Sequence, residues 1–238
     1  NTFSVQVWYQ GDYNFCHYVA TPRVCFDIIS DDKVIVSSGK ETKSRLLPYF
    51  VNEKRKLITQ QIGYSFSLDY TMKKREFQNS KEIESVSEPT LRKTELLRFL
   101  PKKAAKKIAD KVYDLGEETV GLFYMEMNSS GKVLTTISFS EHLIKDEVPR
   151  IIGGRDFSFE VTSCGKQEVF NPFRKIGCRY LQVDSDADII EIGVMPCEYP
   201  FKLKDNLLNL NSLEEKIYNT SIKTLKLNAF EHYYDCPW

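Results

Sequence analysis

The sequence predicts a mainly β protein made of two β-sandwich, jelly-roll-like units followed by one C-terminal helix. Short runs rich in β-branched and aromatic residues recur at intervals of roughly 8–12 residues, and turn-forming residues separate them. Helical periodicity of apolar residues is clear only near the C-terminus. With 238 residues, 42% of them hydrophobic and 28% charged, the chain is long enough to bury a core and too apolar to be disordered.

The first predicted unit covers residues 1–85 and is an accessory β-sandwich. Its expected strands alternate or cluster apolar residues between turn formers, and they are Ser4–Tyr9, Arg23–Ile29, Lys33–Val36 and Gly63–Asp69. The stretch Met72–Pro89 is polar and charged with little periodicity. We therefore interpret it as a connector and place a domain boundary within it.

The second predicted unit covers residues 86–204 and is also a β-sandwich. Val120–Met127 and Lys132–Phe139 are two expected strands, and the turn between them contains Asn128 and Gly131, which both tolerate positive φ. This arrangement predicts a hairpin. Further strands are expected at Phe157–Val161, Cys178–Val183 and Ile189–Met195. Pro101–Lys111 has two interpretations: a helix, or a polar loop that leads into a strand over Lys111–Leu115.

The last predicted part, residues 205–238, is a linker and a helix over Leu213–Phe230. Ser212 and Glu215 have the spacing of a capping box at its start. One helical face is apolar and carries Leu213, Ile217, Ile222, Leu225 and Ala229. Such a face predicts self-association of the chain unless another element covers it.

The charge balance and the cysteine pattern exclude several classes of protein. Lys and Arg number 33 and Asp and Glu number 33, so a dedicated nucleic-acid-coating protein is not expected. No apolar run approaches the roughly 20 residues needed to cross a bilayer, so no membrane partner is expected. The six cysteines include no C-x-x-C pair and only three histidines accompany them, which argues against a metal site. Reduced thiols favour a cytoplasmic location, with secretion as the alternative if a signal has been removed.

Several local motifs favour structural roles. Asp184–Asp188 imitates the start of a calcium loop but lacks its glycine and bidentate glutamate, so a hairpin turn is expected. The basic run Lys102–Lys111 lacks interleaved aromatics and is interpreted as a solvated face. His17 and His142 are expected to be structural or surface residues, although Glu141 and His142 follow a strand and are placed to reach a ligand from a loop at a sandwich edge. No catalytic triad and no cofactor are predicted.

Four stretches together resemble a known family. They are Asp114–Gly121, Ser140–His142, Arg155–Phe157 and Phe173–Tyr180, and they are similar to the β-sandwich domain that precedes the catalytic barrel in bacterial α-L-rhamnosidases of glycoside hydrolase family 78. The ending Glu231–Trp238 contains Asp-Cys-Pro and resembles the entry to that barrel. The likeness covers roughly residues 90–238, and the chain is then expected to be a fragment that leads into a missing (α/α)₆ barrel.

The resemblance implies a parent enzyme that removes terminal α-L-rhamnose with inversion, using a general acid and a general base. Both groups are expected beyond Trp238, so no catalytic residue is assigned within this chain. Asp235 matches the motif aspartate and is expected to bind sugar hydroxyls. The implied partner is a rhamnosylated glycan or glycoside. The alternative function is a stand-alone carbohydrate-binding module, which requires a planar row of exposed aromatics such as Trp8, Tyr9, Tyr13 and Tyr18.

Overall fold

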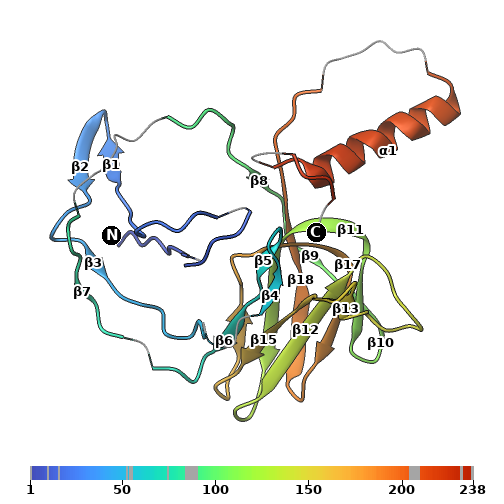
Figure 1. Ribbon diagram of the computed structural model, residues 1–238, viewed down its shortest axis with the longest axis horizontal. Coiled ribbons are helices and arrows are strands. Elements are labelled where there is room, and N and C mark those ends of the chain that lie inside the picture. Colours follow the sequence, from blue (N-terminus) through green and yellow to red (C-terminus); the bar gives the residue numbers. More distant parts are fainter. Residues whose placement is uncertain are drawn as a thin grey trace. The chain divides into compact units, whose positions relative to one another are not determined.

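The structure is a computed structural model. It describes residues 2–9, 11–15, 17–51, 53, 56–73, 75–83, 91–203, 210–230 and 233–236. The chain divides into two compact units, Asn1–Thr90 and Leu91–Trp238, each described by itself (Figure 1). The second predicted boundary, between residues 204 and 205, falls within residues 204–209, which are outside the described residues. It stays a prediction.

The first unit consists of short strands that pair as ribbons. β1 (Asp27–Ser30) pairs with β2 (Lys33–Ser37), β3 (Lys43–Ser44) with β7 (Gln78–Asn79), and β4 (Leu57–Thr59) with β5 (Gly63–Tyr64). β6 (Ser67–Asp69) follows, with Leu68 buried. Within the described part of this unit alone these strands form only two-stranded ribbons, so an accessory sandwich over residues 1–85 stays a prediction.

The predicted strand over residues 4–9 is wrong. These residues are extended but make no strand pairing among the described residues, and Val5 and Val7 are more than half exposed. Trp8 packs its ring against Phe66 at 5.3 Å. The alternating pattern is present, but no neighbouring strand is available to bury its apolar side, and a strand gains most of its stability from such cross-strand packing.

The second unit is a β-sandwich. Its strands are β8 (Arg98–Phe99), β9 (Lys103–Ala104), β10 (Lys106–Ala109), β11 (Val112–Asn128), β12 (Leu134–Ser140), β13 (Ile151–Ile152), β14 (Arg155–Asp156), β15 (Ser158–Thr162), β16 (Glu168–Phe170), β17 (Lys175–Asp184) and β18 (Asp188–Glu198). The main strand order is β15-β12-β17-β11-β18-β8, with antiparallel pairing throughout. The predicted mainly β class is confirmed.

β11 links the two layers because it bends in the middle. Its first half pairs with β17 and its second half with β16 and β18. Asp114 lies opposite Tyr180 and Thr119 lies opposite Cys178, so β11 carries extra residues between these two pairs. Gly116 sits in this bulge with φ of +83°, a conformation that glycine adopts at little cost. β11 pairs with β17 on both sides of this bulge, at 112–114 and at 119–122, and its pairing with β18 begins only at Gly121, so the strand changes partners beyond the bulge.

Aromatic side chains from both layers fill the core. The ring of Phe123 on β11 lies 4.9 Å from that of Phe159 on β15 and 5.8 Å from that of Phe170 on β16, and all three are buried. Edge-to-face contacts of this kind add to the gain from burial itself. Phe173, in contrast, is 39% exposed and lies outside this core.

The predicted hairpin between Val120–Met127 and Lys132–Phe139 is wrong. β11 and β12 are not partners, because β17 lies between them in the strand order. The turn at 128–131 therefore crosses from one layer to the other. The turn after Asp184 likewise joins β17 and β18, which flank β11 on opposite sides, so it is not a hairpin turn either.

Within residues 101–111, Lys103–Ala104 and Lys106–Ala109 are strands and no residue is helical, which removes the helical interpretation. β9 pairs with β18 through Ala104 and Gly193, and β10 pairs with β11 through Lys107 and Tyr113. Helix propensity favours Ala and Lys locally, but the available strand edges satisfy the backbone of this segment instead. The basic run thus lies along the sandwich, with Lys106 and Lys107 exposed.

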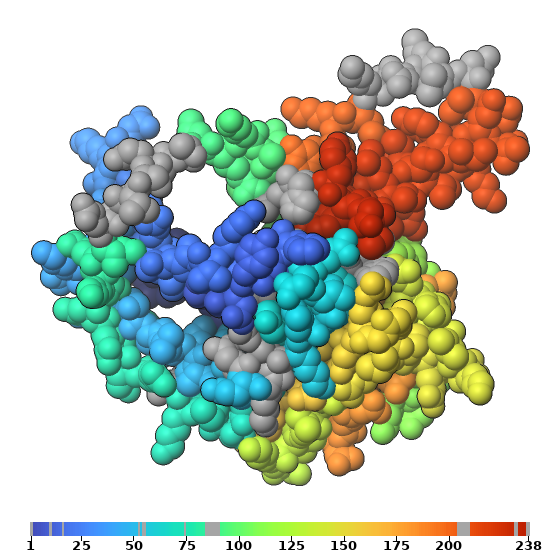
Figure 2. Space-filling view, viewed as in Figure 1, coloured from blue at the N-terminus to red at the C-terminus, as the bar shows by residue number. Residues whose placement is uncertain are grey.

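Among the described residues there is one α-helix, α1 (Ser212–Asn228). Its N-cap is Asn211, whose side chain accepts from the backbone N–H of Glu214 while Glu214 accepts from the N–H of Asn211. The predicted capping box was placed one residue too late, because Asn caps as well as Ser. No α1 residue is buried, and Figure 2 shows the helix, in orange-red, extending away from the sandwich.

The residues after α1 anchor it to the sandwich. Phe230 is buried against Val120 and Cys197. The ammonium of Lys175 lies 3.6 Å from the centre of the Phe230 ring and 4.0 Å from that of Tyr234. Leu213 and Ile217, at the other end of the helix, are 64% and 57% exposed. Self-association through this apolar face stays a prediction.

Candidate functional site

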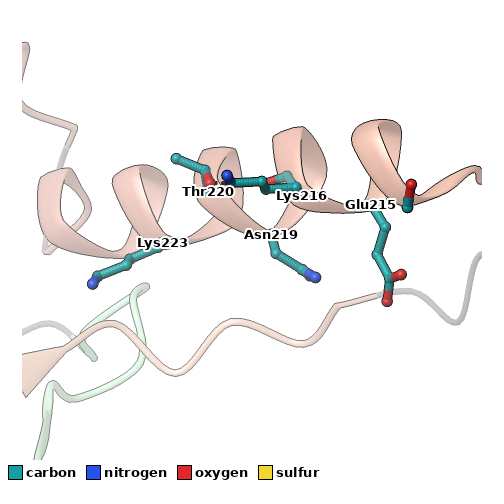
Figure 3. A pocket seen from close by; sticks show the side chains of 6 residues that line it. Glu215, Lys216, Asn219, Thr220 and Lys223 are labelled. Carbon is teal, nitrogen blue, oxygen red and sulfur yellow. Dashed lines mark hydrogen bonds between the residues drawn. The ribbon is translucent and has the colours of Figure 1, made fainter.

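Two hollows on the described residues of the second unit are candidate sites. The larger, about 450 Å³, is a polar groove along α1 (Figure 3). In that view Glu215, Asn219 and Lys223 point to the same side of the helix. Every residue that lines the groove belongs to this one helix, so no second element encloses a ligand from the opposite side. It is the weaker candidate despite its size.

The smaller hollow, about 200 Å³, is lined by four different elements or their connections. We call it the β12-end pocket, and its lining residues are Phe139, Ser140, Glu141, His142, Ile152, Phe157 and Gly177. Phe139 and Phe157 are buried and meet edge to face at 5.7 Å. Glu141 and His142 are exposed at the rim. Apolar walls with a few convergent polar groups are typical of small-molecule sites.

An ion pair fixes the wall that carries Ile152 and Phe157. Arg150 donates from Nε and Nη2 to the two carboxylate oxygens of Asp156, at 3.0 and 2.8 Å. The N–H of Phe157 donates to the carbonyl of Arg150 at 2.9 Å. These bonds close the base of the β13–β14 hairpin, and the bidentate geometry holds the wall in one orientation.

A half-buried carboxyl lies behind the pocket. Glu118 belongs to the β11 bulge, immediately before Thr119 and Val120, which pair with Cys178 and with the lining residue Gly177. Its Oε1 atom is buried without a hydrogen-bond partner. Burial, with a smaller contribution from the negative charge of Glu141, raises the pKa of Glu118 from 4.5 to about 7.

The same charges act on a neighbouring thiol. Cys178 is fully buried, and its burial, together with the charges of Glu118 and Glu141, raises its pKa well above the usual value. Cys178 is therefore a neutral thiol rather than a nucleophile. Thr119, next to Glu118, lies opposite Cys178, and Ser140, next to Glu141, lies opposite Tyr180, so the two glutamates flank the same part of β17.

The pocket gathers residues from stretches that are far apart in sequence. Glu141 and His142 line the pocket rim and are exposed, as expected of surface residues, and their contact with a ligand stays a prediction. Glu118 was not predicted as a site residue. The sequence offers only two adjacent glutamates in a strand-like run, and nothing local tells which of them is buried.

Other predicted residues lie elsewhere. Asp235 is exposed in a bend and accepts a weak hydrogen bond from the thiol of Cys236 at 3.5 Å. Its predicted contact with sugar hydroxyls stays a prediction. His17 packs edge to face on Tyr9 in the first unit.

The described residues contain no cluster of three or more potential metal-ligating side chains. Among them no helix is long and apolar enough to cross a membrane. Cys25, Cys164, Cys178 and Cys197 are free thiols.

The fold is similar to that of solved rhamnosidases. The α-L-rhamnosidase from Dictyoglumus thermophilum matches 72% of this chain and 22% of its own length, with 18% identity and a TM-score of 0.53. The α-L-rhamnosidase from Aspergillus terreus matches 59% of this chain and 18% of its own, at 19% identity and a TM-score of 0.49. The GH78 family rhamnosidase of Bacillus sp. GL1 matches 58% and 16%, at 19% identity and a TM-score of 0.46.

The chain thus spans 16% to 22% of the length of these three proteins. No protein-family model and no curated protein matches the sequence. At 18% identity the likeness to the Dictyoglumus thermophilum protein shows a shared fold, and the activity of that protein is not thereby carried to this chain.

Proposed function

We propose that this chain is a non-catalytic part of a glycoside hydrolase related to α-L-rhamnosidases. In this proposal the whole enzyme removes terminal α-L-rhamnose with inversion, and the second unit supports a catalytic barrel that follows it. The observation that carries the proposal is the shared fold with the Dictyoglumus thermophilum α-L-rhamnosidase over 72% of this chain. The Asp-Cys-Pro motif directly after α1 supports the same reading.

The carboxylates of the β12-end pocket give a reason to place the chemistry elsewhere. Inverting hydrolysis needs an acid and a base on opposite faces of the sugar, with room between them for a water molecule. Glu141 stands at the pocket rim, whereas Glu118 is not among the lining residues. This pair therefore does not flank a bond of a bound substrate. The proposed acid and base lie beyond Trp238, and Asp235 binds sugar hydroxyls.

The test combines an intact mass with release of nitrophenol from a nitrophenyl α-L-rhamnoside. A protein of 27.7 kDa is expected to release none. The same assay on a longer chain that extends past Trp238 is expected to show release, and Asp235→Ala in that chain is expected to raise KM. Turnover by the 27.7 kDa chain would show that the catalytic carboxylates lie within residues 1–238.

The alternative, a stand-alone carbohydrate-binding module, has less support. A flat sugar platform needs aromatic rings that share a plane. Tyr13 and Tyr18 are exposed, but the angle between their ring planes is 67°. The Trp8 ring packs against the ring of Phe66. The proposed partner remains a rhamnosylated glycan or glycoside of the whole enzyme. A cytoplasmic location stays a prediction that rests on the free thiols.

A further inference from the structure

We propose that the β12-end pocket binds a small organic ammonium ion. The apolar body of the ligand would occupy the space bounded by Phe139, Ile152 and Phe157, with its ammonium group beside Glu141. This inference does not rest on the proposed glycosidase function, because every residue involved lies in the second unit and none takes part in sugar hydrolysis.

The size of the cavity limits the ligand to one ring or its equivalent. A dry apolar cavity of roughly 150 Å³ accommodates benzene. The β12-end pocket, at about 200 Å³, accommodates a six-membered ring that carries one polar substituent. The two buried phenylalanines and half-buried Ile152 offer such a ring a largely apolar surface.

The charges around the pocket select the sign of the polar substituent. Glu141 stands at the rim, and its negative charge already disfavours ionisation of Glu118. A carboxylate ligand would place a further negative charge beside Glu141 and be repelled. An ammonium group would pair with Glu141 and relieve the repulsion between the two glutamates, and charge-assisted hydrogen bonds of this kind are the strong ones.

The polar atoms of the site also favour a donor over an acceptor. The carboxylate of Glu141 stands at the rim, and an ionised carboxylate only accepts hydrogen bonds, whereas Glu118 lies outside the lining and acts on a ligand through its charge alone. An ammonium ion has three donors and no acceptor. A bare metal ion fits less well, because the described residues offer no cluster of three metal ligands.

The experiment is calorimetric titration of the 238-residue chain at pH 7 with three probes of one shape: cyclohexylammonium, cyclohexanol and cyclohexanecarboxylate. The ammonium is expected to bind about tenfold or more tightly than the alcohol, since a charge-assisted bond contributes about 1.5–3 kcal/mol. The carboxylate is expected not to bind. Equal affinity for ammonium and alcohol, or no binding of the ammonium, overturns the proposal. Binding of L-rhamnose but not of the ammonium would assign the pocket to a neutral sugar instead.

Proton release provides a second readout. Because a nearby cation lowers the pKa of Glu118, ammonium binding near pH 7 is expected to expel protons, so the measured heat depends on the ionisation heat of the buffer. Glu118→Gln should abolish the proton release, and Glu141→Gln should weaken binding by about tenfold. Glu147→Gln, at an exposed glutamate of the same loop, is the matched control and should change neither. Unchanged proton release in Glu118→Gln would contradict the assignment.

Discussion

Arg179 and Asp114 form a bidentate ion pair between β17 and β11, with Nε–Oδ1 and Nη2–Oδ2 distances of 2.9 and 3.0 Å. Asp114 also accepts from the N–H of Gly116 at 2.6 Å. One carboxylate therefore joins two strands and holds the glycine with positive φ at the start of the bulge. Hydrogen bonds from Arg179 are the main cause that lowers the pKa of Asp114 below 3.8.

Asp114→Ala is expected to lower the free energy of unfolding by about 1 to 2 kcal/mol, because the N–H of Gly116 loses its acceptor. Urea denaturation at pH 7 measures this. The control is Asp110→Ala, whose side chain is 88% exposed and 4.0 Å from Lys107, and which should change stability by less than about 0.5 kcal/mol. Equal losses in both variants would show that the bulge does not depend on Asp114.

Gly121 is required by a close approach of two strands. A Cβ atom there would lie 2.1 Å from the carbonyl oxygen of Met195 on β18, which is backbone and cannot move aside easily. Gly121→Ala is expected to cost about 3 kcal/mol or more, or to prevent folding. Gly131→Ala, where nothing lies within 4 Å of the added atom, should leave the thermal midpoint nearly unchanged. A stable Gly121→Ala protein would mean that β11 and β18 are not in this register.

The strand positions of the second unit could be predicted, but their pairing could not. The apolar run 120–127 falls within the second half of β11 and the run 132–139 matches β12 to within two residues at each end, since alternation is a local property. A turn rich in Asn, Ser and Gly can close a hairpin, and it can equally well connect two strands that are not partners. Which one forms depends on β17, about 50 residues further along the chain, competing for the edge of β11.

The burial of Glu118 could not be predicted from the sequence, for a similar reason. Glu117 and Glu118 are adjacent, yet Glu117 pairs with Lys103 at 2.8 Å and with Lys223, whereas Glu118 faces the interior. The two lysines lower the pKa of Glu117 to about 2, while burial raises that of Glu118 to about 7. The bulge at Gly116 sets which of the two turns inward, and no local pattern encodes the number of residues in a bulge.

The raised pKa of Glu118 predicts a fall in stability with rising pH. Between 4.5 and about 7 the folded state holds a proton that the unfolded state has released, so unfolding is favoured as pH rises through this window. Burial is the main cause of the raised pKa of Glu118, and the negative charge of Glu141 adds to it. Relative to the wild-type chain, Glu118→Gln is expected to gain about 1 to 2 kcal/mol between pH 5 and pH 8, because solvent around this partly exposed carboxyl screens part of the effect.

Chemical denaturation of both proteins at several pH values checks this prediction. Glu126→Gln, on the same strand and in contact with the side chain of Gln167, is the control and should follow the wild-type pH profile. A stability difference between Glu118→Gln and wild type that stays constant from pH 5 to pH 8 would place the pKa of Glu118 near its ordinary value.

Phe230 is expected to decide whether α1 stays docked. No α1 residue is fully buried, and the helix contacts the sandwich through ion pairs of Lys223 and Lys226 with Glu117 and Glu198 and through half-buried Leu227. Exposed ion pairs contribute little, so the attachment depends mainly on the cluster of Phe230 with Val120 and Cys197. Phe230→Ala removes the ring from this cluster and should release the helix while leaving the sandwich folded. Amide hydrogen exchange should then show protection over 212–228 falling by about tenfold or more, with β11 and β17 unaffected. Tyr233→Ala, at a side chain 73% exposed, should leave the exchange of α1 unchanged, and equal protection in both variants would mean that other contacts hold the helix.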